Sequence, residues 1–150
     1  MLTSSAPITG EVLTFFKIAL GIHVYECYGA TESCGPLTVT SPLDPTAGHV
    51  GGVSPVWKMR LRDCPELGYY GTDDPPRGEL LYHGTSMFKG YFKNPEKTKE
   101  VFDEDGWICS GDVAKVNPNG SIQIFDRAKN IFKLCQGDYI APEKLENVYV

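Results

Sequence analysis

Glycine and proline divide the chain after Pro45 into short apolar segments, and this punctuation limits the fold more than any other feature. A long helix cannot run through such a stretch, because proline removes a backbone donor and glycine weakens helices. The segments HVGGVSPVWKMRLRD, GELLYHGTSMFKGYF and GSIQIFD instead favour short strands. Gly78, Gly84 and Gly90 predict tight turns between strands. We therefore expect a β-rich unit over residues 48–125, with a distorted, barrel-like shape.

One short helix is expected within this unit. Asn94 is a favourable N-cap residue and Pro95 fits the first helical position. Thr98, Val101 and Phe102 would then lie on one face of the helix.

Residues 1–47 show a different pattern, which indicates the end of a parallel α/β unit. Thr9 can cap a helix with apolar residues such as Phe15 at helical spacing, and Gly21 suits its last turn. HVYECYG follows as an apolar strand that ends at Gly29. A helix, a strand and a glycine turn in this order present a ligand loop at the carboxyl edge of an α/β sheet.

Charge and cysteine content argue against several classes of protein. The net charge of −5 disfavours sequence-independent nucleic-acid binding, which needs a basic surface. The five cysteines are odd in number and form no CxxC pair, so they favour neither a disulfide framework nor a zinc site. We expect a reducing compartment. No stretch approaches the roughly 20 apolar residues of a membrane span.

The segment YGATE, residues 28–32, is the first candidate site. Gly29 allows a sharp turn, and Tyr28 offers a flat face to a base. The hydroxyl of Thr31 and the carboxylate of Glu32 suit a phosphate oxygen and its Mg²⁺. Taken alone, the segment equally fits a plain turn with a capping threonine and a surface glutamate.

Two later segments carry the remaining candidates. In GWICSGD, Asp112 follows a glycine at an expected strand end, where a carboxylate can accept both hydroxyls of a ribose. An Asx turn is the alternative. In DRAKNIFK, Arg127 can pair with ribose or phosphate oxygens, and Lys129 and Lys133 add mobile charges. A solvated basic edge is the alternative there.

The order of these segments resembles the adenylate-forming superfamily, which includes acyl-CoA synthetases, luciferases and peptide-synthetase adenylation domains. YGATE, GELLYHGTSMFKGYFKNPEKT, GWICSGD and DRAKNIFK occur in succession as they do in that superfamily. KLCQGDYIAPEKLENVY and NPNGSIQIFDRAKNIFK are most similar to the eukaryotic long-chain fatty acyl-CoA synthetases.

The resemblance covers nearly all 150 residues and implies an α/β fragment in four parts. These parts are the end of a large N-terminal α/β subdomain, a β-rich subdomain, a hinge, and the start of a mobile C-terminal domain. Their implied ranges are 1–47, 48–125, 126–130 and 131–150.

The resemblance also implies a long-chain fatty acid–CoA ligase that works in two steps. A fatty carboxylate attacks the α-phosphorus of Mg²⁺-bound ATP, which yields an acyl-adenylate and pyrophosphate. The thiol of CoA then displaces AMP and forms a thioester. The implied partners are therefore a fatty acid, ATP and CoA, with Mg²⁺ as the metal and no nucleic acid.

The implied roles follow from positions within the motifs. Tyr28 would stack on adenine beside a short loop, Thr31 would contact phosphate, and Glu32 would hold Mg²⁺. Lys129 would be the hinge, and Lys133 would lie on a hairpin that approaches the nucleotide and the pantetheine arm. The implied catalytic residues are Thr31, Glu32 and Lys133. The implied cofactor-binding residues are Ser5, Ala6, Pro7, Tyr28, Gly29, Asp112, Arg127, Lys129 and Gly137.

Some family features depart or are absent. Ser4 stands where the family usually has glycine. The sequence lacks the upstream Ser/Thr/Gly-rich phosphate loop and the distal lysine that orients the carboxylate. The helix expected to open at Pro142 would have only about two turns before Val150. We expect a fragment of the synthetase that is inactive by itself and exposes apolar residues such as Phe15, Phe16 and Val148.

Two matters stay open at this stage. The alternative function is a truncated, non-catalytic module that binds nucleotide or docks on a synthetase. The full-length protein would work at the cytoplasmic face, and its peripheral association with a membrane such as the endoplasmic reticulum is left open.

Overall fold

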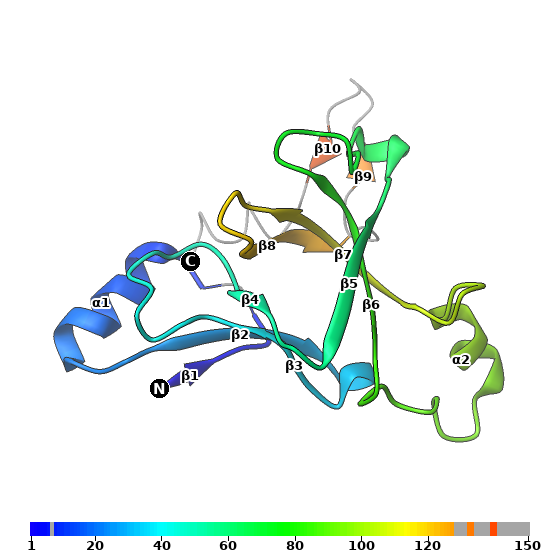
Figure 1. The fold of residues 1–150 in the computed structure, drawn as a ribbon, viewed down its shortest axis with the longest axis horizontal. Helices are drawn as coiled ribbons and strands as arrows, with labels where there is room; N and C mark the ends of the chain where they lie inside the picture. The colour runs from blue at the N-terminus through cyan, green and yellow to red at the C-terminus, as the bar shows by residue number, and fades with distance from the viewer. Residues whose placement is uncertain (7, 128–131, 134–138, 141–150) are drawn as a thin grey trace.

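The computed structural model describes residues 1–6, 8–127, 132–133 and 139–140, which form two main sheets (Figure 1). The first sheet has the strand order β1-β2-β3-β4, and the second has the order β5-β6-β7-β8. The strands of the first sheet are Leu2–Thr3, Tyr25–Ala30, Gly35–Val39 and Gly52–Val53. The strands of the second sheet are Trp57–Arg62, Arg77–Gly84, Ile108–Val116 and Ile122–Arg127. A further antiparallel pair joins β9 (Phe132–Lys133) to β10 (Tyr139–Ile140).

In the described part of the chain, two α-helices lie at opposite ends of the molecule (Figure 1). The helix α1 spans Gly10–Leu20, and its N-cap Thr9 accepts a hydrogen bond from the amide of Val12 at 3.4 Å. Gly21 ends α1 in the left-handed conformation, with φ of 59°. The expected first helix is therefore confirmed.

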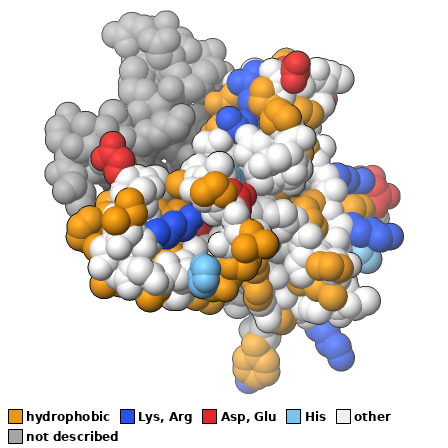
Figure 2. Space-filling model, turned by 60° about the vertical axis from the view of Figure 1, so that its left-hand side comes forward, with side chains coloured by type: hydrophobic (Ala, Val, Ile, Leu, Met, Phe, Trp, Pro, Cys, Tyr) orange, Lys and Arg blue, Asp and Glu red, His pale blue; other side chains and the backbone are white. Residues whose placement is uncertain are grey.

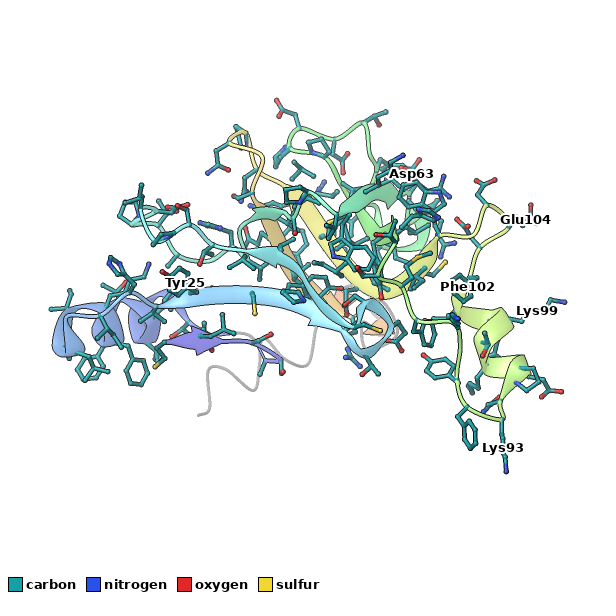
Figure 3. The ribbon with its side chains drawn as sticks, turned by 60° about the horizontal axis from the view of Figure 1, so that its bottom comes forward. Tyr25, Asp63, Lys93, Lys99, Phe102 and Glu104 are labelled. Atoms are coloured by element: carbon teal, nitrogen blue, oxygen red, sulfur yellow. The ribbon has the colours of Figure 1, made fainter. Side chains whose placement is uncertain are left out.

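The second helix, α2, spans Pro95–Val101, and the side chain of Asn94 caps it by accepting a hydrogen bond from the amide of Lys97. This confirms the predicted helix start. Figure 3 shows Lys93 and Lys99 pointing outward at this end of the molecule. Phe102 follows α2 and packs against the core.

The first sheet is mixed rather than parallel throughout. β1 runs parallel to β2, whereas β2, β3 and β4 pair antiparallel. β2 also continues one residue past Gly29, where the register shifts, and a short 3₁₀ helix (η1, Thr31–Ser33) follows. The expectation that the strand ends in a sharp turn at Gly29 is wrong. This glycine instead allows close packing, since a Cβ there would lie 2.6 Å from the carbonyl oxygen of Gly35.

The second sheet is an antiparallel meander, with β6 between β5 and β7 and with β8 at one edge. A second 3₁₀ helix (η2, Pro65–Leu67) lies in the connection from β5 to β6. Within the described residues β8 does not pair with β5, so this sheet is open and does not close into a barrel.

Gly78 and Gly84 correct another expectation. Both lie inside β6 rather than in turns. A Cβ at Gly78 would lie 2.4 Å from the carbonyl oxygen of Arg62, and one at Gly84 would lie 2.4 Å from the ring of Trp57. These glycines therefore let strand β5 and its tryptophan approach β6 closely.

The core joins the two sheets. Leu37 of β3 packs with Trp57, Tyr82 and Ile108 of the second sheet, and each of these four residues is buried. Leu80, Ala114 and Ile122 form a second buried cluster. Tyr28 of β2 packs against both clusters, so this tyrosine lies where the sheets meet.

Several expectations fall outside the described residues. Pro7, Lys129, Gly137 and the helix expected from Pro142 belong to this group. The division of the chain into four parts stays a prediction. Among the described residues, neither helix has the length and apolarity needed to cross a membrane.

Candidate functional site

Three predicted site residues meet where the two sheets join. The hydroxyl of Tyr28 on β2 donates a hydrogen bond to Asp112 Oδ2 on β7 at 2.5 Å. Arg127 lies opposite Asp112 in the β7–β8 pairing, and its Nε is 3.5 Å from Asp112 Oδ1. The carboxylate of Asp112 therefore lies between a tyrosine hydroxyl and a guanidinium group.

The sequence predicts Asp112 at a strand end, but the residue lies inside β7. The strand is irregular at this point: its pairing with β6 shifts register, and Gly111 has φ of 73°. The amide of Asp112 donates to Ser110 Oγ at 3.0 Å. This bulge re-aims the carboxylate of Asp112, as bulges near ligand sites commonly do.

Glu79 supports the bulge and was not predicted from the sequence. Its Oε1 accepts a hydrogen bond from the amide of Gly111 at 3.1 Å, and its Oε2 accepts one from Arg62 Nε at 3.1 Å. The residue is buried. The position of Glu79 inside the apolar segment GELLYHG could have indicated this role, because a buried carboxylate requires hydrogen-bond or charge partners.

The hydroxyl of Tyr28 is held as a hydrogen-bond donor. Burial raises the pKa of Tyr28, and the adjacent carboxylate of Asp112 raises it further. The ring is half-buried among residues of both core clusters. Its role in stacking on adenine stays a prediction.

Tyr82 links this group to the YGATE segment. Its hydroxyl is buried and has no hydrogen-bond partner within the described part of the chain. Burial raises the pKa of Tyr82, and the charges of Glu32 and Asp112 raise it further. Both carboxylates therefore disfavour ionisation of the Tyr82 hydroxyl.

Glu32 is half-buried on η1 and has a phenolic partner. The hydroxyl of Tyr91 donates a hydrogen bond to Glu32 Oε1, and this bond raises the pKa of Tyr91 to about 12. The carbonyl of Glu32 accepts a hydrogen bond from the amide of Phe88 at 2.8 Å. The preceding Thr31 is exposed.

The carboxylate of Glu32 fits only one type of metal site. The described residues contain no group of three or more His, Cys, Asp or Glu side chains that could hold a metal ion. Mg²⁺, however, is commonly held by one or two carboxylates together with the phosphates of a substrate. A single glutamate would therefore fit Mg²⁺ that is brought in with a nucleotide.

The predicted adenine loop lies next to β2. Ser5 and Ala6 are exposed, and Ser5 has φ of 77°. Ser4 Oγ donates a hydrogen bond to the carbonyl of Cys27 at 2.9 Å, which ties the loop to the strand that carries Tyr28. Lys133 pairs through its backbone with Tyr139, and its side chain lies outside the described residues.

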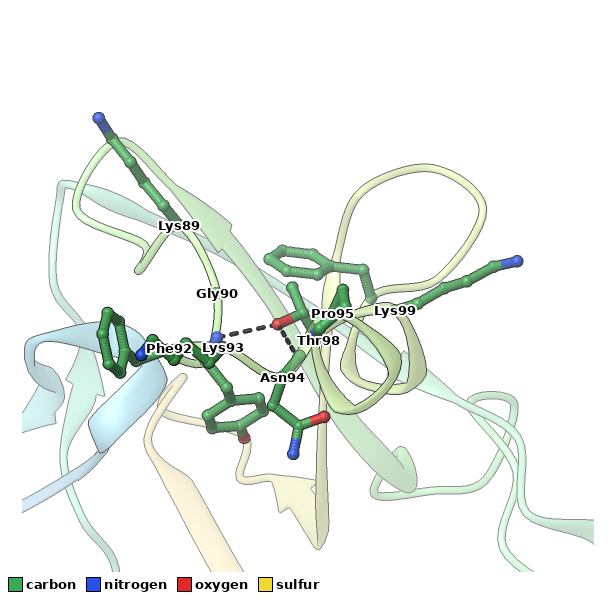
Figure 4. Close-up of a pocket in the computed structure, with 10 residues that line it drawn as sticks. Lys89, Gly90, Phe92, Lys93, Asn94, Pro95, Thr98 and Lys99 are labelled. Atoms are coloured by element: carbon green, nitrogen blue, oxygen red, sulfur yellow. Dashed lines mark hydrogen bonds between the residues drawn. The ribbon is translucent and has the colours of Figure 1, made fainter.

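A surface pocket of about 580 Å³ lies beside α2, and Tyr91 is one of the residues that line it (Figure 4). Aromatic and lysine side chains line this pocket, including Phe102 and Lys99. Neither Tyr28 nor Asp112 contributes to its lining. The pocket is therefore separate from the group around Asp112.

Comparison with known proteins gives related sequences over the whole chain. The family model for AMP-binding enzymes matches residues 1–92. Long-chain-fatty-acid–CoA ligase 5 from Mus musculus is 51% identical over 149 residues, which are 99% of this chain and 22% of the mouse protein. Long-chain-fatty-acid–CoA ligase 1 from Homo sapiens is 47% identical over 150 residues, which are 21% of the human protein. The chain thus spans about a fifth of the length of these relatives.

Solved structures have the same fold. The A domain of carboxylic acid reductase from Segniliparus rugosus, in complex with AMP and a co-purified carboxylic acid, gives a TM-score of 0.83 at 39% identity. The match covers 99% of this chain and 22% of that one. ATP-bound MatB from Rhodopseudomonas palustris gives a TM-score of 0.80 at 29% identity, over 97% of this chain and 28% of that one.

Proposed function

Because the chain belongs to the AMP-binding enzyme family, we propose that it forms part of a long-chain fatty acid–CoA ligase. The identity of about half its residues to curated ligases of that type supports this proposal. The observation that carries it is the meeting of Tyr28, Asp112 and Arg127 at the junction of the two sheets. The chain spans about a fifth of these ligases, so the reaction would require the full protein.

In the first step, a fatty carboxylate oxygen bonds to the α-phosphorus of ATP while the bond to pyrophosphate breaks. Asp112 would accept hydrogen bonds from the two ribose hydroxyls, and Arg127 would donate to ribose oxygens. The ring of Tyr28 would lie against adenine. These contacts fix the nucleotide, and fixed geometry lowers the barrier to the in-line attack.

Glu32 would hold the Mg²⁺ that accompanies ATP, and Thr31 would contact a phosphate oxygen. The metal would supply neutralisation of the charge that builds on the phosphate oxygens. In the second step, the sulfur of CoA bonds to the acyl carbon while the bond to AMP breaks. Lys133 would approach the site on the β9–β10 hairpin for this step.

The role of Asp112 can be tested with Asp112→Asn in the full natural chain that carries this sequence. Two hydrogen bonds to a charged acceptor contribute about 1.5–3 kcal/mol each, so we expect ATP–pyrophosphate exchange to fall about 100-fold or more. Asp105→Asn is the matched control, because the side chain of Asp105 is 71% exposed on a loop. Exchange that persists in Asp112→Asn, or that falls equally in the control, would contradict the assignment.

A further inference from the structure

We propose that Tyr91 is a positioning residue for Glu32, and that its hydroxyl fixes one carboxylate oxygen so that the other faces the Mg²⁺ of bound ATP. This inference rests on the proposed function. It adds a residue from a distant part of the chain to the metal-binding step.

The two carboxylate oxygens of Glu32 differ in their hydrogen bonds. Oε1 accepts the hydrogen bond from Tyr91 Oη. Within the part of the chain that the structure describes, no hydrogen bond or ion pair involves Oε2. A carboxylate fixed through one oxygen presents the other in a defined direction, as partners of metal ligands generally do.

The backbone of Glu32 is held by the same segment. The amide of Phe88 donates to the Glu32 carbonyl at 2.8 Å. The ring of Phe88 contacts Tyr91 edge to face at 5.0 Å and stacks with Phe102 at 5.9 Å. The residues that follow β6 therefore form hydrogen bonds with both the main chain and the side chain of Glu32.

Tyr91 is itself anchored to α2. Its amide donates to Thr98 Oγ1 at 2.9 Å, and Thr98 Oγ1 donates to the carbonyl of Asn94 at 2.8 Å (Figure 4). Gly90 lies directly against Thr98, since a Cβ at Gly90 would be 2.7 Å from Thr98 Cγ2. The first turn of α2 thus fixes the backbone from which the tyrosine extends.

A positioning role makes a specific prediction about metal coupling. Without the Tyr91 hydroxyl, the carboxylate of Glu32 can rotate. Mg²⁺ binding must then also order this carboxylate, which makes the binding free energy less favourable. Loss of such a partner commonly lowers metal affinity about 10-fold to 100-fold. Binding of the nucleotide without metal should not change, because Tyr91 acts only through Glu32.

The experiment measures ATP affinity by calorimetry, with Mg²⁺ and with a chelator, in the full natural chain that carries this sequence. The ratio of the two affinities is the Mg²⁺ coupling. We expect Tyr91→Phe to lower this coupling about 10-fold or more, and Glu32→Gln to lower it at least as far. Thr98→Val removes the hydrogen bond that anchors the Tyr91 amide but keeps the Tyr91 hydroxyl. We therefore expect a smaller loss of Mg²⁺ coupling. Tyr70→Phe is the matched control, since Tyr70 is 39% exposed on the loop between β5 and β6, and it should keep the parent coupling.

The outcomes separate the two proposals. Parent coupling retained in Tyr91→Phe would overturn the positioning role and leave the proposed function standing. Equal losses of affinity with Mg²⁺ and with chelator would also overturn it, because the hydroxyl would then act on the nucleotide or on folding. A parent protein that does not bind ATP would overturn both proposals.

Discussion

At the scale of single residues, Glu26 is the side chain most at odds with its surroundings. It lies on β2, is 8% exposed, and its Oε2 has no hydrogen-bond partner among the residues described. Burial raises the pKa of Glu26 above its ordinary value of 4.5, and the charge of Lys17 offsets part of this. A raised pKa means that the folded state prefers the protonated carboxyl group.

The sign of the pH dependence follows directly. The contribution of Glu26 to stability is fully present below pH 4.5 and is lost as the pH rises through the folded pKa. Glu26→Gln stays neutral throughout, so we expect it to unfold at a higher denaturant concentration than the parent at pH 8 but not at pH 4. The gain comes from removing the buried negative charge and should be on the order of 1 kcal/mol, since one pKa unit corresponds to about 1.4 kcal/mol.

Denaturation of the full natural chain at both pH values checks this expectation. Glu104→Gln is the control, because Glu104 is exposed on the loop that follows α2 (Figure 3). A Glu26→Gln variant that is less stable than the parent at pH 8 would contradict the prediction.

At the scale of elements, strand β6 needs a glycine at position 84, where the strand packs against the ring of Trp57. Gly84 lies opposite Trp57 in the β5–β6 pairing. A Cβ at this position would lie 2.4 Å from Trp57 Cε3 and 2.7 Å from the carbonyl oxygen of Val56. Because the core around Trp57 and Tyr82 is closely packed, the ring cannot move without disturbing its neighbours.

We therefore expect Gly84→Ala to lower the free energy of unfolding by about 1–3 kcal/mol, as overpacking commonly does. Chemical denaturation followed by tryptophan fluorescence, to which Trp57 and Trp107 both contribute, measures the effect. Gly52→Ala, on β4, is the control, because a Cβ there would meet nothing within 4 Å. A Gly84→Ala variant as stable as Gly52→Ala would disprove the packing argument.

At the scale of the whole molecule, the outer side of α1 is an uncovered apolar surface. Val12, Phe15, Ile18 and Leu20 are 44%, 63%, 77% and 56% exposed. Figure 2 brings the α1 end forward and shows hydrophobic side chains at the surface there. Apolar patches of this kind usually mark a surface that another part of a protein covers. The relatives extend well beyond the matched segment, and we expect such a region to cover α1.

The 150-residue chain alone should consequently self-associate. We expect light scattering after size exclusion to show species larger than a monomer, and Phe15→Ser with Ile18→Ser to reduce them. Phe92→Ser is the control, because Phe92 is 89% exposed in the segment before α2, and α2 lies at the opposite end of the molecule from α1 (Figure 1). A strictly monomeric parent chain would refute this expectation.

The sequence by itself determined the local elements. The cap at Thr9, the cap at Asn94 with Pro95, and the alternation of GSIQIFD each specify a helix or strand through contacts within a few residues. The ordered motifs likewise indicated the family and named Tyr28, Asp112 and Arg127. Such signals are readable because propensity and capping act over one turn or one strand.

Only the tertiary structure decided which side chains of different elements contact each other. The bond from Tyr28 to Asp112 spans 84 positions in the sequence, and the bond from Tyr91 to Glu32 spans 59. No local pattern encodes such pairs, so Tyr91 and Glu79 were missed as partners. The sequence places Gly78 and Gly84 in turns for the same reason: a glycine needed for close approach between strands has the same local signature as a glycine in a turn.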